Sequence, residues 1–197
     1  VERSEMTFSR RAFVLTTPFA LAACVTREED IAAQQAVRTR RRYGQMYAAI
    51  ETEPFPIPAV DVRRVDPRFL RQEVRDPAME PPGTIVVDLG SRHAYLVQTG
   101  GRALRYGIGV GKQQAFNCEG EATIARKAEW PRWTPRPAMI AREPERYARY
   151  ADGLPGGPGN PLGPRALYLY RDGRDTLYRL HGTVEPQSIG TMVSSGC

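Results

Sequence analysis

The sequence predicts a mainly β fold, a mixed or antiparallel β-sandwich with short helices, preceded by an N-terminal helix and a proline-rich segment. Short runs of β-forming residues follow one another from residue 84 onward. Gly100-Gly101 and an Asp-Gly turn at residues 172–173 separate neighbouring runs, as tight hairpin turns require. With 197 residues, the chain is long enough for one domain with accessory segments.

The first 24 residues are typical of an export signal. Residues 9–14 read Ser-Arg-Arg-Ala-Phe-Val, which resembles a twin-arginine signal, and an apolar run over residues 12–23 follows. The run ends in Leu-Ala-Ala-Cys, which resembles a lipobox, so Cys24 would be lipidated and become the mature N-terminus. The alternative is ordinary cleavage near Ala23. We therefore expect a periplasmic or cell-envelope protein held on the membrane through a lipid anchor.

Residues 25–83 are expected to form a tether. A loose apolar face over residues 28–50 predicts a helix, and its arginine run at residues 38–42 favours a solvated or headgroup-facing side. Long elements cannot form in the following stretch, because prolines interrupt it at Pro54, Pro56, Pro58, Pro67, Pro77, Pro81 and Pro82. Residues 51–83 are therefore a linker, or a lead-in wrapped on the domain.

A β-rich domain is expected over residues 84–197. Strands are predicted at residues 84–88, 94–99, 102–110, 121–127, 166–170 and 176–181. A short helix is expected over 143–151, and a short helix or turn over 186–193. Alternate glycines at 107, 109 and 111 resemble a phosphate loop only weakly, because neither a Lys-Ser/Thr pair nor a helix follows. They favour a close backbone approach or a bulge.

The formal net charge of +6 comes almost wholly from arginine, because Lys112 and Lys127 are the only lysines. A basic balance can indicate nucleic acid or an anionic surface. The sequence has no aromatic-interleaved basic patch or nucleic-acid motif, so we expect no nucleic-acid partner. We expect the arginines to lie mostly on the solvated surface, with a general attraction to an anionic envelope.

Catalytic chemistry is suggested by the last stretch of the chain, His181 to Cys197. A cysteine attacks carbonyl groups as the thiolate, and a histidine is the usual base that activates it. Gly182 leaves a backbone carbonyl that can orient the imidazole of His181. Ser194, Ser195 and Gly196 form a small approach to Cys197 whose backbone N–H groups can converge on an oxyanion.

These residues also fit two other interpretations. Cys197 could be a small buried residue and His181 a hydrogen-bonded core histidine. A zinc site usually has four ligands, and the chain has four residues of suitable type, His93, Cys118, His181 and Cys197. No pair among them has the short spacing in sequence that is typical of zinc ligands. We therefore expect no metal and no cofactor. Cys118 is left as a free thiol or a disulfide partner of Cys197.

The pattern His-Gly-Thr, then Ser188-Ile189-Gly190, then Ser-x-Gly-Cys resembles the signature of the L,D-transpeptidases, the YkuD-type catalytic domain that remodels bacterial peptidoglycan. The resemblance covers about residues 84–197. The segment Trp-Pro-Arg-Trp-Thr-Pro at 130–135 and the Gly/Pro-rich loop at 156–163 also resemble that domain, although turn chemistry alone explains the loop equally well.

The resemblance implies acyl transfer. Cys197 would attack the carbonyl at the L-centre of diaminopimelate in a peptidoglycan tetrapeptide stem, with His181 as base and D-alanine leaving. An amine from another stem or from an outer-membrane lipoprotein would then take the acyl group. The carbonyl of Gly182 would orient His181, N–H groups at Ser195 to Cys197 would hold the oxyanion, and Ser194 and Thr183 would support them. The alternatives are a hydrolase of the same stem, and an inactive lipid-anchored wall-binding module.

The sequence departs from the family pattern at three places. Many members have histidine where this chain has Ser195, and many have tryptophan near Cys118. Members also continue past the cysteine with an apolar residue, an arginine and a closing strand, whereas this sequence ends at Cys197. We therefore expect the catalytic domain to be incomplete at its C-terminus, with an exposed sheet edge.

Overall fold

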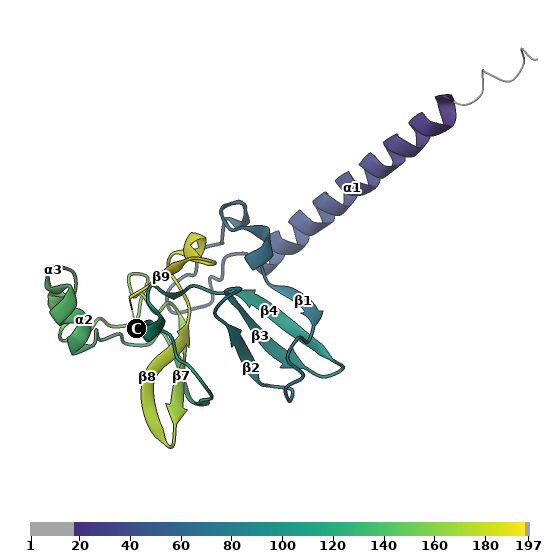
Figure 1. Ribbon diagram of the computed structural model, residues 1–197. Helices are drawn as coiled ribbons and strands as arrows, with labels where there is room; N and C mark the ends of the chain where they lie inside the picture. Colours follow the sequence, from purple (N-terminus) through teal and green to yellow (C-terminus); the bar gives the residue numbers. More distant parts are fainter. Residues whose placement is uncertain (1–17, 196–197) are drawn as a thin grey trace, which may run out of the picture. The chain divides into compact units, whose positions relative to one another are not determined.

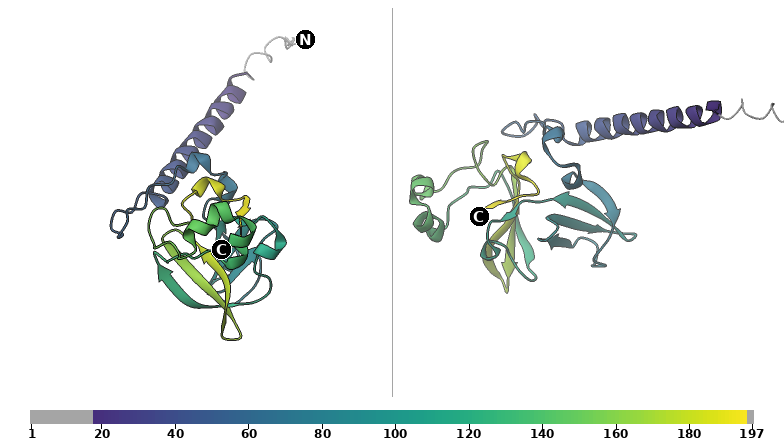
Figure 2. Two further views of the ribbon diagram at one scale, coloured as in Figure 1. Left: turned by 90° about the vertical axis from the view of Figure 1, so that its left-hand side faces the viewer. Right: turned by 45° about the horizontal axis from the view of Figure 1, so that its top comes forward.

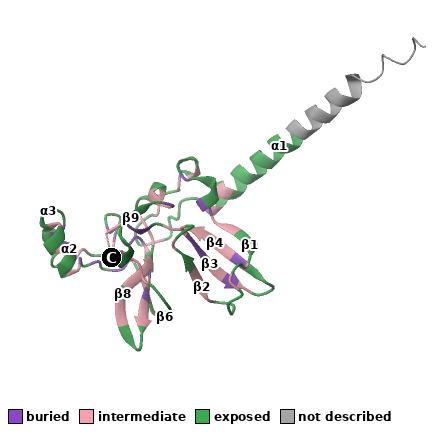
Figure 3. Ribbon diagram, viewed as in Figure 1, coloured by how far each residue is buried: buried purple, intermediate pink, exposed green. Residues whose placement is uncertain are grey.

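The computed structural model describes residues 18–195, with side chains of the first helix described from residue 30. The chain divides into two compact units, which meet in the sequence between Met46 and Tyr47. The first unit contains α1 (Pro18–Met46), whose described side chains are exposed along most of its length (Figures 1 and 3). In the described part of the chain, no helix is both long and apolar enough to span a bilayer.

The second unit contains a four-stranded antiparallel sheet in the order β1-β4-β3-β2. Its strands are β1 (Gln72–Arg75), β2 (Ile85–Asp88), β3 (His93–Gln98) and β4 (Arg102–Gly107). Between β3 and β4 the turn spans residues 99–101, and both glycines have the positive φ that the sequence predicted, 73° and 67°. Local turn chemistry therefore determines this hairpin.

A three-stranded antiparallel sheet contains β6 (Thr123–Glu129), β7 (Arg165–Arg171) and β8 (Arg174–His181). Asp172 and Gly173 close the β7–β8 hairpin with φ of 50° and 71°. A Gly at this turn adopts positive φ without steric cost, and Asp tolerates it better than most residues. The hairpin places His181 at the last position of β8.

A third, two-stranded sheet joins β5 (Val110–Gly111) to β9 (Met192–Ser194) in parallel. Figure 1 labels β9 near the upper ends of β7 and β8, and Figure 2 shows the same yellow segment near the end of the chain marked C. The sequence predicted one continuous strand over 102–110 and a helix or turn over 186–193, so this pair is a correction. The chain forms a single-turn helix at Pro186–Ser188 and then a short strand. The predicted class, mainly antiparallel β with short helices, is confirmed.

Helices in the second unit are short. They are α2 (Pro137–Arg142) and α3 (Pro144–Tyr147), with 3-10 turns at Val62–Arg64, Pro67–Phe69, Gln114–Phe116, Ala148–Tyr150 and Pro186–Ser188. The helix predicted over 143–151 is thus α3 followed by a 3-10 turn. Met139 of α2 and Tyr147 of α3 form a buried core cluster with Trp133 and Leu162. Burial of this cluster fixes the aromatic-proline segment against the Gly/Pro-rich loop.

The proline-rich residues contribute packing to the second unit. Val65, Phe69 and Leu70 are buried, and β1 pairs with β4 along its whole length. A Cβ on Gly107 would lie 2.4 Å from Cβ of Phe69, so this glycine permits the close backbone approach that the sequence suggested. The part of the lead-in around Phe69 is therefore packed on the sheet.

Candidate active site

His181 is fixed by backbone pairing on both sides of its position. It lies opposite Ala166 in the β7–β8 ladder, and the N–H of Gly182 donates to the carbonyl of Arg165 at 3.0 Å. The side chain of His181 is exposed. The backbone is therefore held in register while the imidazole remains accessible from solvent.

The imidazole of His181 lies against the backbone of the next residue. Its Nδ1 is 2.7 Å from the carbonyl oxygen of Gly182. Because a carbonyl oxygen can only accept, Nδ1 carries the proton in this contact. In the neutral ring, Nε2 then holds the lone pair that a base needs. The carbonyl that the sequence singled out is therefore in place to orient this ring.

The Gly/Pro-rich loop packs directly on the residues that follow His181. Gly163 has φ of +66°, and a Cβ there would lie 2.9 Å from the backbone nitrogen of Thr183. A Cβ on Gly182 would lie 3.1 Å from Cδ of Pro164. Two glycines thus allow two backbone segments to approach more closely than any side chain would permit.

Asn160 holds that loop together. Its side chain is 1% exposed, and Nδ2 donates to the carbonyls of Pro131, Leu154 and Pro155 at 3.0, 3.2 and 3.0 Å. Its Oδ1 accepts from the N–H of Leu162 at 2.9 Å. A buried amide that is satisfied at both ends stabilises one loop conformation, and this conformation positions Gly163 beside Gly182.

Hydrogen bonds at Thr183 and Gly190 hold the connector, the segment that follows His181. The hydroxyl of Thr183 accepts from the N–H of Glu185 at 2.9 Å, which makes a local turn. The N–H of Gly190 donates to the carbonyl of Ile108 at 3.1 Å. This bond links the connector to the segment between β4 and β5.

The chain approaches its last residues on the β5–β9 pair. Ser194 lies opposite Gly111, and its carbonyl accepts from the N–H of Lys112 at 2.9 Å. The carbonyl of Ser195 accepts from Nη2 of Arg142 at 2.7 Å, and the same guanidinium lies 4.6 Å from the ring centroid of Phe116. Ser194 and Ser195 are thus held by backbone and by an arginine of α2. Gly196 and Cys197 lie outside the described residues.

The remaining sequence-predicted residues are dispersed. His93 lies on β3, where Nε2 is 3.1 Å from the carbonyl of Arg68, and Cys118 lies in the loop after the Gln114–Phe116 turn. The twin-arginine residues fall outside the described part, as does the side chain of Cys24. Within the described residues, no three His, Cys, Asp or Glu side chains gather to hold a metal ion.

An ion pair from the lead-in reaches the strand beside His181. Nη2 of Arg165 lies 2.5 Å from Oε1 of Glu53, and Nε1 of Trp130 donates to Oε2 at 3.0 Å. The hydrogen bond from Arg165, and secondarily that from Trp130, lowers the pKa of Glu53 below its ordinary value. The carboxylate thus stays charged and holds the first residue of β7, whose carbonyl accepts from Gly182.

Several of these residues carried no sequence signal. Arg142 and Glu53 stand in ordinary charged surroundings, and Phe69 stands among the interrupting prolines of the lead-in. The Gly/Pro-rich loop did carry a signal, because its composition indicated a tight turn. Only its packing shows that the loop lies against Gly182 and Thr183.

Comparison with known proteins gives a consistent result. The family model of the L,D-transpeptidase catalytic domain (YkuD) matches residues 82–197. Two Escherichia coli K12 relatives are described as Probable L,D-transpeptidase ErfK/SrfK, 40% identical over 38% of this chain and 23% of the relative, and Probable L,D-transpeptidase YbiS, 38% identical over 48% and 29%. This chain spans 23–44% of the length of the curated relatives it matches.

A solved structure is similar over a longer part of the chain. It is described as the crystal structure of a probable carnitine operon oxidoreductase from Brucella melitensis. The two chains are 49% identical, and the TM-score is 0.55, over 70% of this chain and 84% of the other. The similarity supports the same arrangement of strands.

Proposed function

This chain belongs to the L,D-transpeptidase catalytic domain (YkuD) family, and on that premise we propose that it transfers peptidoglycan stem peptides through a thioester on Cys197. The observation that carries the proposal is the contact between Nδ1 of His181 and the carbonyl of Gly182, at 2.7 Å. It sets the tautomer in which Nε2 can accept the thiol proton.

In the first half of the reaction, Nε2 of His181 takes the proton of the Cys197 thiol. The thiolate attacks the carbonyl at the L-centre of diaminopimelate in a tetrapeptide stem, and the negative charge moves to the carbonyl oxygen. Backbone N–H groups at Ser195, Gly196 and Cys197 stabilise this oxyanion, a contribution of about 3 kcal/mol for a typical donor. The C–N bond to D-alanine then breaks, and His181 returns the proton to the leaving amine.

In the second half, an amine attacks the thioester and the thiol is regenerated. The acceptor is the diaminopimelate amine of another stem or a lysine of an outer-membrane lipoprotein, and the product is a crosslink. The strand pairing of Ser194 with Gly111 and the hydrogen bond from Arg142 to the carbonyl of Ser195 support this proposal. An oxyanion site must be held rigidly before the reaction begins. Ser194 and Thr183 are the residues that steady this region.

We place the protein in the cell envelope, held on a membrane through a lipid on Cys24. The basis is the sequence at residues 9–24 together with the family, whose substrate lies outside the cytoplasmic membrane. Metabolic labelling with a fatty acid tests this, with Cys24→Ala as control. The label should be lost in the variant, and retention of label would contradict the anchor.

The experiment that tests the reaction is intact-mass analysis of the full-length protein after incubation with a tetrapeptide stem. We expect a mass increase equal to the acyl tripeptide, released D-alanine, and no increase in Cys197→Ala. Adding a stem amine separates transfer from hydrolysis, because a transferase then forms a crosslinked product in place of free tripeptide. Binding of the stem without thioester formation would instead indicate a wall-binding module.

A further inference from the structure

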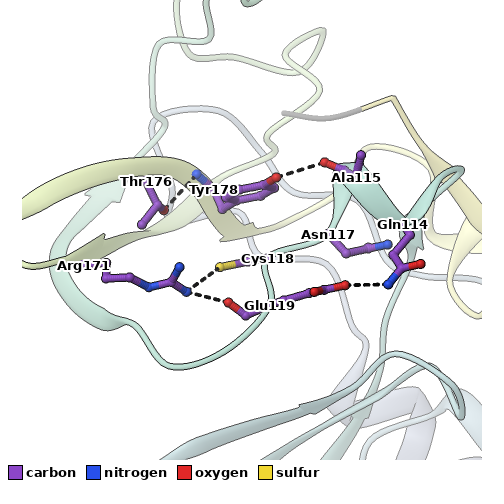
Figure 4. Close-up of a pocket in the computed structure, with 8 residues that line it drawn as sticks. All are labelled: Gln114, Ala115, Asn117, Cys118, Glu119, Arg171, Thr176 and Tyr178. Atoms are coloured by element: carbon purple, nitrogen blue, oxygen red, sulfur yellow. Dashed lines mark hydrogen bonds between the residues drawn. The ribbon is translucent and has the colours of Figure 1, made fainter.

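A pocket of about 480 Å³ lies between the loop that contains Gln114 and Glu119 and the β7–β8 hairpin (Figure 4). Arg171, Thr176 and Tyr178 line it from the hairpin side. This volume is within the range of sites that bind small molecules. Its lining residues include one cation, Arg171, and one anion, Glu119.

Residues that line the pocket are connected to two segments of the candidate active site: the strand that ends at His181 and the strand that contains Ser194. Tyr178 belongs to β8, the strand that ends at His181, and its hydroxyl donates to the carbonyl of Ala115 at 2.9 Å. On the opposite wall, Oδ1 of Asn117 accepts from the N–H of Gly111 at 2.8 Å, and Gly111 lies opposite Ser194. The pocket is thus tied to the strand before His181 and to the strand that leads toward Cys197.

The guanidinium of Arg171 is oriented without being neutralised. Its Nε donates to the carbonyl of Glu121 at 3.0 Å, and Nη2 donates to the carbonyl of Glu119 at 2.5 Å. Carbonyl groups fix the plane of a guanidinium but leave its charge in place. Among residues 30–195, no carboxylate forms an ion pair with this side chain.

The carboxylate of Glu119 belongs to the loop side of the pocket and is turned away from Arg171. Its Oε1 accepts from Nε2 of Gln114 at 2.8 Å, and Figure 4 shows the side chain extended toward Gln114. Within the described part of the chain it also forms no ion pair. The pocket therefore presents a cation from the hairpin and an anion from the loop that form no ion pair with each other.

We propose that this pocket binds an α-amino acid zwitterion, namely the free amino-acid end of the diaminopimelate side chain in the acyl donor. The inference rests on the proposed function for the identity of the donor. Arg171 receives the carboxylate, because its planar donors match carboxylate geometry, and Glu119 receives the ammonium group. Asn117 and Tyr178 provide neutral polar edges to the pocket.

Other ligand classes fit this pocket less well. A simple anion would face Glu119, and a simple cation would face Arg171. An apolar group would remove both charges from water without offering either a partner. A ligand that carries both charges offers a partner to each residue, and an α-carbon that bears an ammonium and a carboxylate carries one of each.

The test compares three tetrapeptide stems bound to full-length protein carrying Cys197→Ala, which cannot form the thioester. The stems carry diaminopimelate, its side-chain amide, or lysine, which has the ammonium but lacks the carboxylate. We expect the diaminopimelate stem to bind at least about tenfold more tightly than either of the others, a difference of about 1.4 kcal/mol. Isothermal calorimetry gives the dissociation constants.

Variants assign the effect to the pocket. In Arg171→Gln the diaminopimelate stem should bind no more tightly than its amide. Glu119→Gln keeps the backbone carbonyl that Arg171 uses and should also weaken binding of the zwitterionic stem by about tenfold. Arg174→Gln, on the same hairpin but outside the pocket, should leave all three affinities unchanged. Circular dichroism confirms folding of each variant.

Equal binding of the three stems, no measurable binding, or an unchanged preference in both pocket variants would overturn the proposal. Thioester formation by wild-type protein with the same stems keeps the two ideas separate. If the thioester forms but the three stems bind equally, the proposed role of the pocket is refuted and the proposed enzyme activity stands. If the stems bind with different affinities but no thioester forms, the proposed role of the pocket stands and the proposed enzyme activity is refuted.

Discussion

The ring of Phe69 occupies the space that a side chain at position 190 would need. A Cβ on Gly190 would lie 2.0 Å from Cε2 of Phe69, and Gly190 has φ of +87°. The same Phe69 contacts Gly107 at the end of β4. One aromatic side chain of the lead-in therefore packs between the four-stranded sheet and the connector that runs from His181 toward Cys197.

Gly190→Ala should destabilise the protein by about 2–4 kcal/mol, because the new methyl group meets both the ring and an unfavourable φ. Urea unfolding gives this value. Gly173→Ala is the matched control, because φ is +71° there and no atom lies within 4 Å of its added Cβ. We expect this control to lose only about 1 kcal/mol.

Phe69→Ala distinguishes overlap with the ring from backbone strain. In a double-mutant cycle, Gly190→Ala should cost less in the Phe69→Ala background than in wild type, because the methyl group then has room. Additive losses would mean that the ring does not restrict position 190.

Asn160 should tolerate no change in its hydrogen-bonding pattern. Asn160→Ala removes the side-chain partner of the buried Pro131 carbonyl and of the Leu162 N–H, and we expect a loss of about 2–4 kcal/mol in urea unfolding. Asn160→Asp should cost more, because a carboxylate would face the carbonyls of Pro131, Leu154 and Pro155. Asn117→Asp is the control: it keeps the acceptor for Gly111 and loses one exposed bond to the carbonyl of Gln113, so it should lose less than about 1 kcal/mol. Equal losses at both positions would contradict the role of Asn160.

The ion pair between Glu53 and Arg165 should make stability depend on pH. The pKa of Glu53 is lowered in the folded protein, so the pair stabilises fully above the unfolded pKa and is lost as pH falls through the folded value. The difference in melting temperature between wild type and Glu53→Gln should therefore shrink as the pH is lowered from neutral through the range below 4.5. Glu129→Gln is the control. Its carboxylate lies 3.8 Å from Arg165 with 75% of the side chain exposed, and we expect little effect. A difference that stayed constant with pH would show that charge at Glu53 does not contribute.

His181→Gln should lower the rate of D-alanine release by roughly 10²–10⁴-fold, the usual contribution of a general base. Binding of the stem peptide should change little, so the loss should appear in kcat more than in KM. His93→Gln is the comparison, because His93 lies on β3 and contacts the backbone of Arg68. We expect it to reduce stability while leaving the pH profile of the folded enzyme unchanged. A His181 variant with normal D-alanine release would exclude this residue as the base.

The sequence by itself determined the hairpins and the family. Gly100-Gly101 and the Asp-Gly turn at 172–173 specify positive φ locally, so the strands on either side were predictable to within a few residues. The motif around His181 identified the family, and the neighbouring Gly182 identified the carbonyl that contacts the imidazole. These features depend on residues adjacent in the chain.

Only the tertiary structure decided which distant segments meet. The parallel pairing of Val110 with Met192, the packing of Phe69 on Gly190, and the pairing of Glu53 with Arg165 join residues that are remote in sequence. Such contacts depend on how the sheets are placed in three dimensions, and a short strand or a lone charged residue gives no local pattern that encodes its partner. The pocket lined by Arg171 and Glu119 exists for the same reason, because folding brings a hairpin end against a loop that neither segment specifies alone.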